Sequence, residues 1–345
     1  MGSHLDLRIG VLSEVLELDD QALIALSSKK FSAQVLREYE RFGQDEARLL
    51  RERAQAAGVT QICRCEERYP QALRSLASAP AVLHVAGRAE LLAELAGGDP
   101  VAVVGSRKAT AYGLDVARML GRGISASGLT VVSGLAIGVD GAAHQGALQA
   151  GGRTMAVIPG FAADAYPRTH RALHRRIVET GVVLSETGPG ATVRRWMLPA
   201  RNRIIAGLSR LTVLVQASTR SGAGITVRAA RGLGRAVGAV PGSVLLEQSH
   251  GPNALLAQGA IVIRDAQDVL DAVLGAGALT LRADAAVALS AEQRTLLDLI
   301  GSGADTLDAL GAVGYSGRES LTLLAGLELA GVLGRVSGGR YVCLL

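Results

Sequence analysis

A short segment, VAVVGSRKATAYG, combines glycine, serine and arginine at a spacing that suits phosphate binding. Gly105, Ser106 and Arg107 follow an apolar run and precede a helix that we expect to begin near Tyr112. A glycine turn before a helix offers backbone N–H groups and the positive end of the helix dipole to an anion, and an arginine adds its guanidinium. We therefore predict a phosphate site here. A plain tight turn with a surface arginine explains the tripeptide alone equally well, since it is neither GxGxxG nor a Walker loop.

Three further segments carry glycines or arginines at the ends of apolar runs. VVSGLAIGVDGAAHQGAL holds a second glycine turn, and PGFAADAYPRTHRALHRR places arginines beside the aromatic residues Phe161 and Tyr166, which suits a nucleotide backbone with a stacked base or simple loop packing. LPARNRIIAGLS and TRSGAGITVRAA complete the set. The additional residues that we predict to bind phosphate or single-stranded DNA are Gly134, Arg168, His170, Arg171, Arg201, Asn202, Arg203, Ser221 and Gly222.

Two other features could suggest catalysis or a core position. Asp140 and His144 lie four residues apart on one helix face, but without a nucleophile or a third metal ligand we expect a structural hydrogen bond between them. Trp196, the single tryptophan, is expected in the core because of its apolar setting. We predict no catalytic residue, no metal site and no cofactor.

The distribution of charge favours a polyanionic partner. The net charge is +5, and arginine supplies most of the basic residues because the chain has only three lysines. No acidic residue occurs between Glu186 and Glu247, whereas nine arginines do. A basic zone of this length among glycine-rich turns indicates nucleic acid more than a solvated face.

The elements that must position these residues follow from the hydrophobic pattern. From Tyr69 onward, short β-branched runs alternate with helix-like segments, which predicts the α/β class with a mainly parallel sheet wrapped by helices. Parallel strands that are buried on both faces are uniformly apolar, and ligands bind beyond their carboxyl ends. The glycines and arginines gather after these runs, so we expect them at one edge of the sheet.

A chain of 345 residues exceeds one hydrophobic core, so several domains are expected. We predict a small helical domain over 5–65, an extended Rossmann-like domain over 66–268, a linker over 269–284 and a third domain over 285–345. Three helices and a hairpin in the last range are the order of a winged helix. We expect no membrane span and a cytoplasmic location, and we interpret the initial MGSH as an expression scar. The cysteines Cys63, Cys65 and Cys343 lack zinc-site spacing and are expected to be reduced thiols.

Taken in order, these motifs resemble the DNA-processing protein A family, also called Smf, roughly from Tyr69 to Asp265. The resemblance rests on YPQALRSLASAPAVLHVAG, VVLSETGPG, SGAGITVRAA and AVPGSVLLEQSHGPNALLAQGA together with the segments quoted above. It implies an extended Rossmann-like fold, a sterile-alpha-motif-like (SAM-like) N-terminal domain and a winged helix. It also implies a homodimer that protects incoming single-stranded DNA in natural transformation and loads RecA onto strands displaced from single-strand-binding protein.

The same resemblance assigns roles to individual residues. The family's GSR arginine falls on Arg107, and the lysine of its YPK-type loop falls on Arg168, which keeps the charge. His170 stands where many members have asparagine, and Asn202 of the RNR motif is a further expected contact.

Alternative functions leave different marks on a sequence. A nucleotide hydrolase of a related Rossmann-like class could use the same glycine turns, but its PGGxGTxxE motif is replaced by PGFAADAYP. The first glycine turn of this chain lacks the dinucleotide-binding fingerprint of a nicotinamide dehydrogenase. The third helix of the C-terminal domain carries Glu319 and Glu328, with Arg318 just before it, which argues against a duplex-DNA reader. Non-enzymatic single-strand binding is therefore the prediction.

Overall fold

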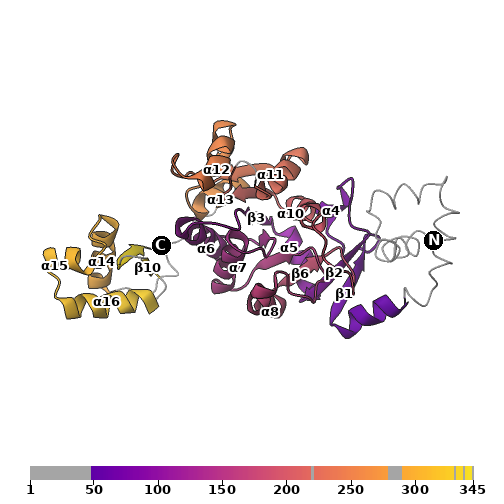
Figure 1. Cartoon of the computed structure of the whole chain (residues 1–345), viewed down its shortest axis with the longest axis horizontal. Coiled ribbons are helices and arrows are strands. Elements are labelled where there is room, and N and C mark those ends of the chain that lie inside the picture. The colour runs from indigo at the N-terminus through magenta and orange to yellow at the C-terminus, as the bar shows by residue number, and fades with distance from the viewer. Residues whose placement is uncertain (1–47, 219–220, 279–289, 330–331, 337–338, 344–345) are drawn as a thin grey trace. The chain divides into compact units, whose positions relative to one another are not determined.

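The computed structural model describes residues 48–218, 221–278, 290–329, 332–336 and 339–343. The chain divides into two compact units, an N-terminal unit through residue 279 and a C-terminal unit from residue 280 (Figure 1). Most of the predicted helical domain over 5–65 lies outside the described residues, apart from a helix over residues 48–56 and the strand that follows it.

The N-terminal unit is built on a nine-stranded sheet with the order β1-β2-β6-β5-β4-β3-β7-β8-β9. β1 and β2 pair antiparallel, as do β2 and β6, and the seven strands from β6 to β9 across the sheet are parallel. The strands are β1 Val59–Cys63, β2 Val82–Gly87, β3 Val101–Val104, β4 Val131–Ser133, β5 Thr154–Val157, β6 Val182–Ser185, β7 Leu211–Leu214, β8 Ala236–Ala239 and β9 Ile261–Val262. The predicted α/β class with a mainly parallel sheet is confirmed.

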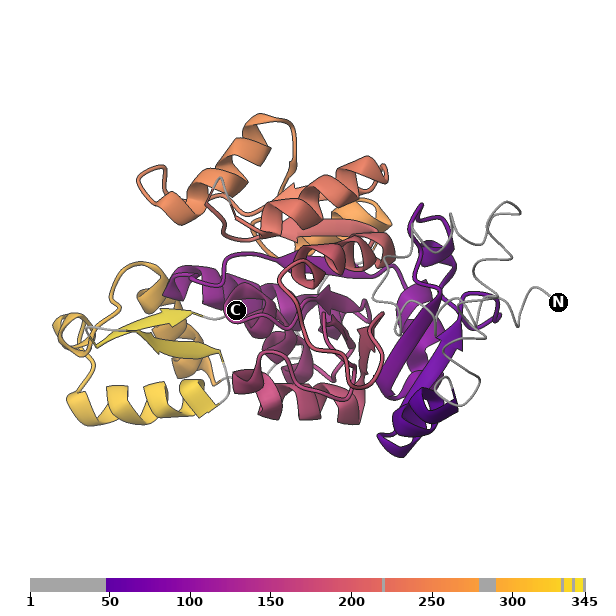
Figure 2. The same ribbon diagram turned by 45° about the vertical axis from the view of Figure 1, so that its right-hand side comes forward.

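Helices flank this sheet on both faces (Figures 1 and 2). The alternation of side chains along β5 sends Met155 and Val157 into one core and Ala156 into the other. The first core also receives α10 and α11, and the second receives α8. The helices of this unit are α4 Gln71–Arg74, η1 Ala89–Leu91, α5 Leu92–Gly97, α6 Ala111–Ala126, α7 Val139–Gln149, η2 Arg168–His170, α8 Arg171–Thr180, α9 Met197–Ala200, α10 Asn202–Leu208, α11 Ala223–Gly232, α12 Glu247–Ala257 and α13 Ala266–Leu274.

Two elements of the N-terminal unit lie across the predicted domain boundaries. Residues 59–63, assigned to the helical domain, form β1 and extend the sheet by pairing with β2. Residues 269–274, assigned to the linker, belong to α13, where Val269, Leu270 and Val273 are buried. α13 begins at an N-cap, since the Asp265 side chain accepts the Asp268 N–H at 3.0 Å. Residues 269–274 thus belong to a packed helix, and residues 279–284 of the predicted linker lie outside the described residues.

The C-terminal unit has the predicted order of three helices and a hairpin. It comprises α14 Ala291–Gly301, α15 Leu307–Ala312, α16 Gly317–Leu329, β10 Leu333–Val336 and β11 Arg340–Cys343. β10 and β11 are antiparallel, and their residues Leu333 and Tyr341 pack with Leu296 and Leu324 in a small separate core. Ser290 and Gln293 form a reciprocal capping box at the start of α14. The winged-helix assignment itself stays a prediction.

Among the described residues, every helix is too short or too polar to cross a membrane.

Candidate functional site

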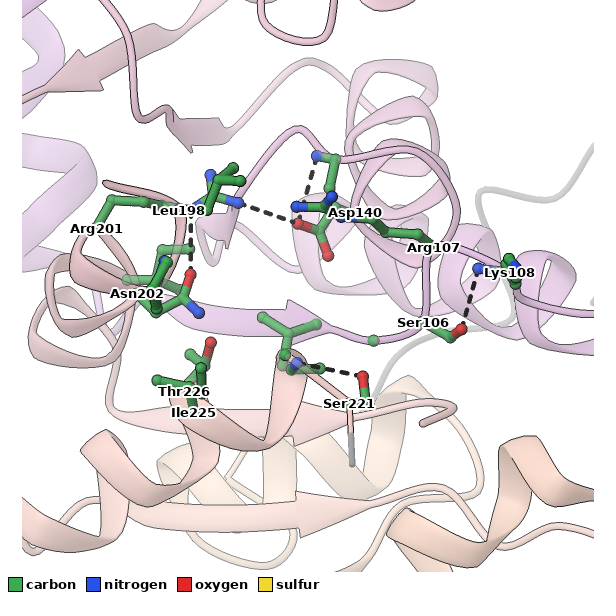
Figure 3. A pocket seen from close by; sticks show the side chains of 17 residues that line it. Ser106, Arg107, Lys108, Asp140, Leu198, Arg201, Asn202, Ser221, Ile225 and Thr226 are labelled. Atoms are coloured by element: carbon green, nitrogen blue, oxygen red, sulfur yellow. Dashed lines mark hydrogen bonds and ion pairs between the residues drawn. The ribbon is translucent and has the colours of Figure 1, made fainter. Parts of the chain in front are cut away.

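A pocket of about 490 Å³ lies at the carboxyl ends of β3 and β7. From β3 the chain winds outward through β4, β5 and β6, then returns to the other side of β3 to form β7 and β8. The crevice at such a reversal is where open α/β sheets bind ligands. Figure 3 shows how the pocket is walled by the loop after β3, by α9 and α10, and by the first turn of α11.

The loop after β3 is held from beneath and presents two cations to solvent. The Ser106 N–H donates to the carbonyl of Gln216 at 2.6 Å, and the Ser106 carbonyl accepts the Val139 N–H at 3.3 Å. The side chains of Arg107 and Lys108 line the pocket, belong to exposed residues, and have no ion-pair partner among the residues that the structure describes. The loop therefore offers positive charge that no ion pair with a described residue neutralises.

Gln216 is a residue that sequence reasoning missed. It is buried at the end of β7, where its Oε1 accepts the Thr110 N–H at 3.0 Å and its Nε2 donates to the Thr110 hydroxyl at 2.9 Å. Gln216 thus fixes both the turn after β3 and the start of α6. The signal was present in LTVLVQ, where a polar residue closes an otherwise apolar strand.

The predicted glycines have different structural reasons. A Cβ on Gly105 would lie 2.6 Å from Cγ2 of Val139 and 2.8 Å from the Gln216 carbonyl, so this glycine is required by internal packing and not by a phosphate. A Cβ on Gly134 would meet the Arg201 guanidinium. A Cβ on Gly222 would meet no atom within 4 Å, and this glycine lines the pocket with Ser221. Of the three, only Gly222 leaves room for a close ligand.

Arg201 is buried and organises the strand ends. Its Nη1 donates to the carbonyls of Gly134 and Val157, and its Nε donates to Oδ1 of Asn202 at 3.1 Å. Its Nη2 lies 3.9 Å from Oδ2 of Asp140. Burial lowers the pKa of Arg201 to about 10, Asp140 opposes that shift, and the group stays charged at neutral pH. Arg201 touches the pocket, but most of its hydrogen-bonding capacity is used within the protein.

The expected hydrogen bond between Asp140 and His144 does not form, and each side chain has another partner. Asp140 Oδ2 accepts the Gly134 N–H at 3.1 Å, whereas Nδ1 of His144 lies 2.7 Å from the Thr154 hydroxyl. Burial raises the pKa of Asp140, and the Arg201 charge and backbone N–H groups oppose this. Burial lowers the pKa of His144 to about 3, so the ring is neutral under ordinary conditions. Both side chains are buried on α7, and buried polar groups need hydrogen-bond partners, so each is bonded to a different neighbour.

Arg203 is directed away from the predicted phosphate site. It forms a two-pronged ion pair with Glu186, including Nη1 to Oε2 at 2.8 Å, and its Nε donates to the Ser78 carbonyl at 2.9 Å. This pair holds α10 to the segments after β6 and before β2. The RNR motif therefore supplies two structural arginines, with Asn202 between them lining the pocket.

The loop before α8 lies beside the pocket but not in its wall. Arg168 and Arg171 are exposed, in η2 and the first turn of α8. Nδ1 of His170 lies 3.0 Å from the Leu135 carbonyl, and its ring approaches Gly141. His170 thus fixes this loop against the segment that precedes α7. The structure brings seven of the twelve predicted residues into the pocket: Gly105, Ser106, Arg107, Arg201, Asn202, Ser221 and Gly222.

Two aromatic residues differ in their exposure to solvent: Phe161 is buried, and Trp196 lies at the surface. Phe161 is buried and packs edge-to-face against His84, with ring centroids 6.0 Å apart, so it is loop packing and not a stacking platform. Trp196 is 49% exposed, and the expectation of a core position is wrong. The apolar neighbours of Trp196 in the sequence, Met197 and Leu198, form the short helix α9 and leave the indole at the surface.

Comparisons with known proteins point to one family. A family model described as DNA recombination-mediator protein A matches residues 60–274, more than half of the chain. The DNA processing protein DprA of Bacillus subtilis is 39% identical over 62% of this chain and 71% of its own length. The putative DNA processing protein DprA of Mycobacterium tuberculosis is 45% identical over 52% of this chain, and the match spans only 46% of that relative's length.

Solved structures show the same fold. The X-ray structure of DNA processing protein A from Streptococcus pneumoniae superimposes with a TM-score of 0.65 at 34% identity, covering 76% of this chain and 92% of that one. A structure of DNA processing protein A from Helicobacter pylori, described as showing a single-stranded DNA binding mode, gives a TM-score of 0.56 at 27% identity over 63% of this chain and 97% of that one.

Proposed function

We propose, because this chain belongs to the DNA recombination-mediator protein A family, that it binds single-stranded DNA at the pocket between β3 and β7. The observation that carries the proposal is the pair of exposed cations, Arg107 and Lys108, on a braced loop at the mouth of that pocket. A phosphate of the strand contacts these two side chains. Arg168 and Arg171 on the neighbouring loop extend the positive surface along the strand.

The rest of the pocket suits a nucleobase. Leu198 and Ile225 provide apolar walls, and Asn202 lines the same space. Oδ1 of Asn202 accepts from Arg201, so Nδ2 is the atom that donates to an acceptor on a base (Figure 3). One amide donor among apolar walls tolerates every base, since all four carry acceptors. The proposed binding is therefore weakly dependent on sequence and strongly dependent on salt.

The biological role that we propose is a recombination mediator of natural transformation that acts in the cytoplasm. Family membership supports this role, in which the protein protects incoming single strands, receives them from single-strand-binding protein and loads RecA. A strand-exchange assay with RecA and strands coated by single-strand-binding protein tests this role. Stimulation by this protein is expected, and no stimulation at saturating protein would contradict it.

Fluorescence anisotropy with labelled oligonucleotides tests the binding site. We expect wild-type protein to prefer single-stranded over duplex DNA, and the Arg107→Ala, Arg168→Ala double variant to lose at least tenfold in affinity. The matched control is Arg210→Ala, since Arg210 is exposed before β7 at the amino-terminal edge of the sheet. Equal loss in the control, or no loss in the double variant, would move the site elsewhere.

The alternative, a nucleotide-hydrolysing enzyme, needs a carboxylate that is available to act on water or sugar. Among the described residues that line the pocket, Asp140 is the single carboxylate, and it is engaged by Arg201 and two backbone N–H groups. We therefore propose that the protein is not an enzyme. Incubation with the four ribonucleoside monophosphates, followed by chromatographic detection of free base, should show no turnover.

We also propose that the protein is a homodimer that uses the β9 edge of the sheet. Ile261 and Val262 are 38% and 48% exposed on this edge strand. Val244 and Leu245, in the segment between β8 and α12, are 76% and 92% exposed. Edge strands with exposed apolar side chains favour pairing with another chain. Sedimentation velocity should show a dimer for wild type and a monomer for Val262→Glu; monomeric wild type would contradict this assignment.

The C-terminal unit is proposed to contribute little to single-strand affinity. α16 carries Glu319 and Glu328 against one arginine, Arg318, and the unit has its own core. We expect a chain truncated after about Ala285 to keep its affinity within threefold. A collapse of affinity would assign DNA contacts to this unit.

A further inference from the structure

Trp196, the only tryptophan of the chain, lies at the surface. Its backbone is fixed at the N-cap of α9: the Met197 N–H donates to the Arg194 carbonyl at 3.1 Å, and the Ala200 N–H donates to the Trp196 carbonyl at 3.2 Å. About half of the side chain remains exposed. A tryptophan with this much apolar area in water costs free energy unless a partner covers it.

The position of Trp196 relative to the pocket narrows the choice of partner. Leu198 and Pro199, which follow it on α9, line the pocket, whereas Trp196 does not. Two residues of chain span at most about 7 Å, so the backbone of Trp196 lies within that distance of Leu198 in the pocket wall. Arg195, directly before it, is exposed. The tryptophan therefore stands next to the proposed nucleotide site and not within it.

Charge favours nucleic acid over protein as the partner. The sequence from residue 187 to residue 246 contains no acidic residue, and Arg194 and Arg195 directly precede Trp196 in the sequence. An aromatic ring flanked by arginines combines a stacking face with cations for the backbone, which is how single strands are held without sequence readout.

We infer that Trp196 stacks on the base of the nucleotide next to the one held in the pocket, and so extends the binding track beyond the pocket wall. This inference rests on the proposed single-strand binding. In this arrangement, Asn202 and its apolar neighbours contact the base of the pocket nucleotide, and the indole stacks on the adjacent base. Every base has a π-face, so Trp196 adds affinity with little sequence preference.

Because Trp196 is the sole tryptophan, its fluorescence reports this one position. We expect titration with an oligothymidine to quench the emission as binding, followed separately by anisotropy of a labelled oligonucleotide, reaches saturation. An oligonucleotide of the same length with abasic sites throughout has the same phosphates but no bases, and it should bind with much less quenching.

Substitutions give the energetic test. Trp196→Ala should weaken binding of oligothymidine roughly 5- to 150-fold, the range that corresponds to loss of one stacked base. The same change should leave binding of the abasic strand within twofold. Trp196→Phe should recover part of the affinity and Trp196→Leu should not, because only phenylalanine retains an aromatic face. Circular dichroism of each variant confirms the fold.

The outcomes separate the inference from the proposed function. DNA binding without quenching, or an equal loss for normal and abasic strands in Trp196→Ala, would overturn stacking and leave the phosphate site intact. Recovery by leucine as complete as by phenylalanine would also overturn it, in favour of simple apolar contact. Absence of any DNA binding by wild-type protein would refute the proposed function itself.

Discussion

Arg107 and Arg201 both stand where an apolar run gives way to a helix, yet they meet opposite surroundings. Arg107 is exposed on the loop after β3 and has no ion-pair partner among the described residues. Arg201 is 7% exposed and is surrounded by Asp140, Asn202 and two backbone carbonyls. Arg107 is available to bind an anionic ligand, whereas Arg201 stabilises the fold through its internal contacts.

This difference separates the residues that hold the site together from those that remain available to a ligand. The buried network of Arg201 and Asp140 ties α10 and α7 to the ends of β4 and β5. The exposed loop depends on Gln216 and Val139 for its position. We therefore expect substitutions in the buried network to change stability first, and substitutions on the exposed loop to change DNA affinity first.

The largest effect on stability is expected for Arg201→Ala. Removing this guanidinium leaves Asp140 buried without its counter-charge and orphans two carbonyls, which should cost about 3–5 kcal/mol of unfolding free energy. Urea denaturation measures the change. Arg107→Ala is the matched control and should shift stability by less than about 0.5 kcal/mol. Similar losses in both variants would erase the distinction between the two arginines.

The buried residue His144 should make the unfolding free energy depend on pH, which the exposed loop residues should not. Its pKa is lowered from 6.5 to about 3 in the folded protein because of burial. The unfolded chain then binds the extra proton, so the contribution of His144 is fully present above about pH 6.5 and is lost as pH falls toward 3. The slope is about 1.4 kcal/mol per pH unit within this window. Unfolding free energies from urea denaturation of wild type and His144→Gln should diverge by this slope as pH falls, and parallel pH curves would show that His144 does not titrate as described.

The smallest expected stability effects distinguish two glycines of the pocket. Gly105→Ala should destabilise by about 1–3 kcal/mol, since the added methyl would overlap Val139 and the Gln216 carbonyl. Gly222→Ala meets open space at a helical φ of −59° and should leave stability unchanged or raise it by up to about 1 kcal/mol. Thermal unfolding compares the two. A destabilised Gly222→Ala would mean that its turn is tighter than the structure shows.

Much of the fold follows from local pattern. Apolar four-residue runs such as VAVV and VVLS predicted the buried parallel strands, and the glycine and arginine segments after them predicted the edge at which the pocket lies. β1 was missed because VTQIC mixes polar and apolar residues, as an edge strand does. α13 was missed because its composition suggested a linker.

The site was harder to predict, since residue type alone does not reveal burial. RNR contains two arginines of similar sequence context, and only the folded chain shows that one pairs with Asp140 and the other with Glu186. The role of Gln216 depends on a partner 106 residues away in the sequence. Trp196 was expected in the core from its neighbours, because sequence spacing does not show that α9 is only one turn long.

The salt dependence of single-strand binding tests the central claim, that exposed loop cations and not the buried arginines contact the DNA backbone. Affinity of an oligothymidine is measured by anisotropy over a salt series for wild type, Arg107→Ala and Arg203→Ala. We expect Arg107→Ala to lower the magnitude of the slope of log K against log salt by about 0.7, one phosphate contact, while Arg203→Ala keeps the wild-type slope. An unchanged slope for Arg107→Ala, or the same decrease for Arg203→Ala, would contradict the claim.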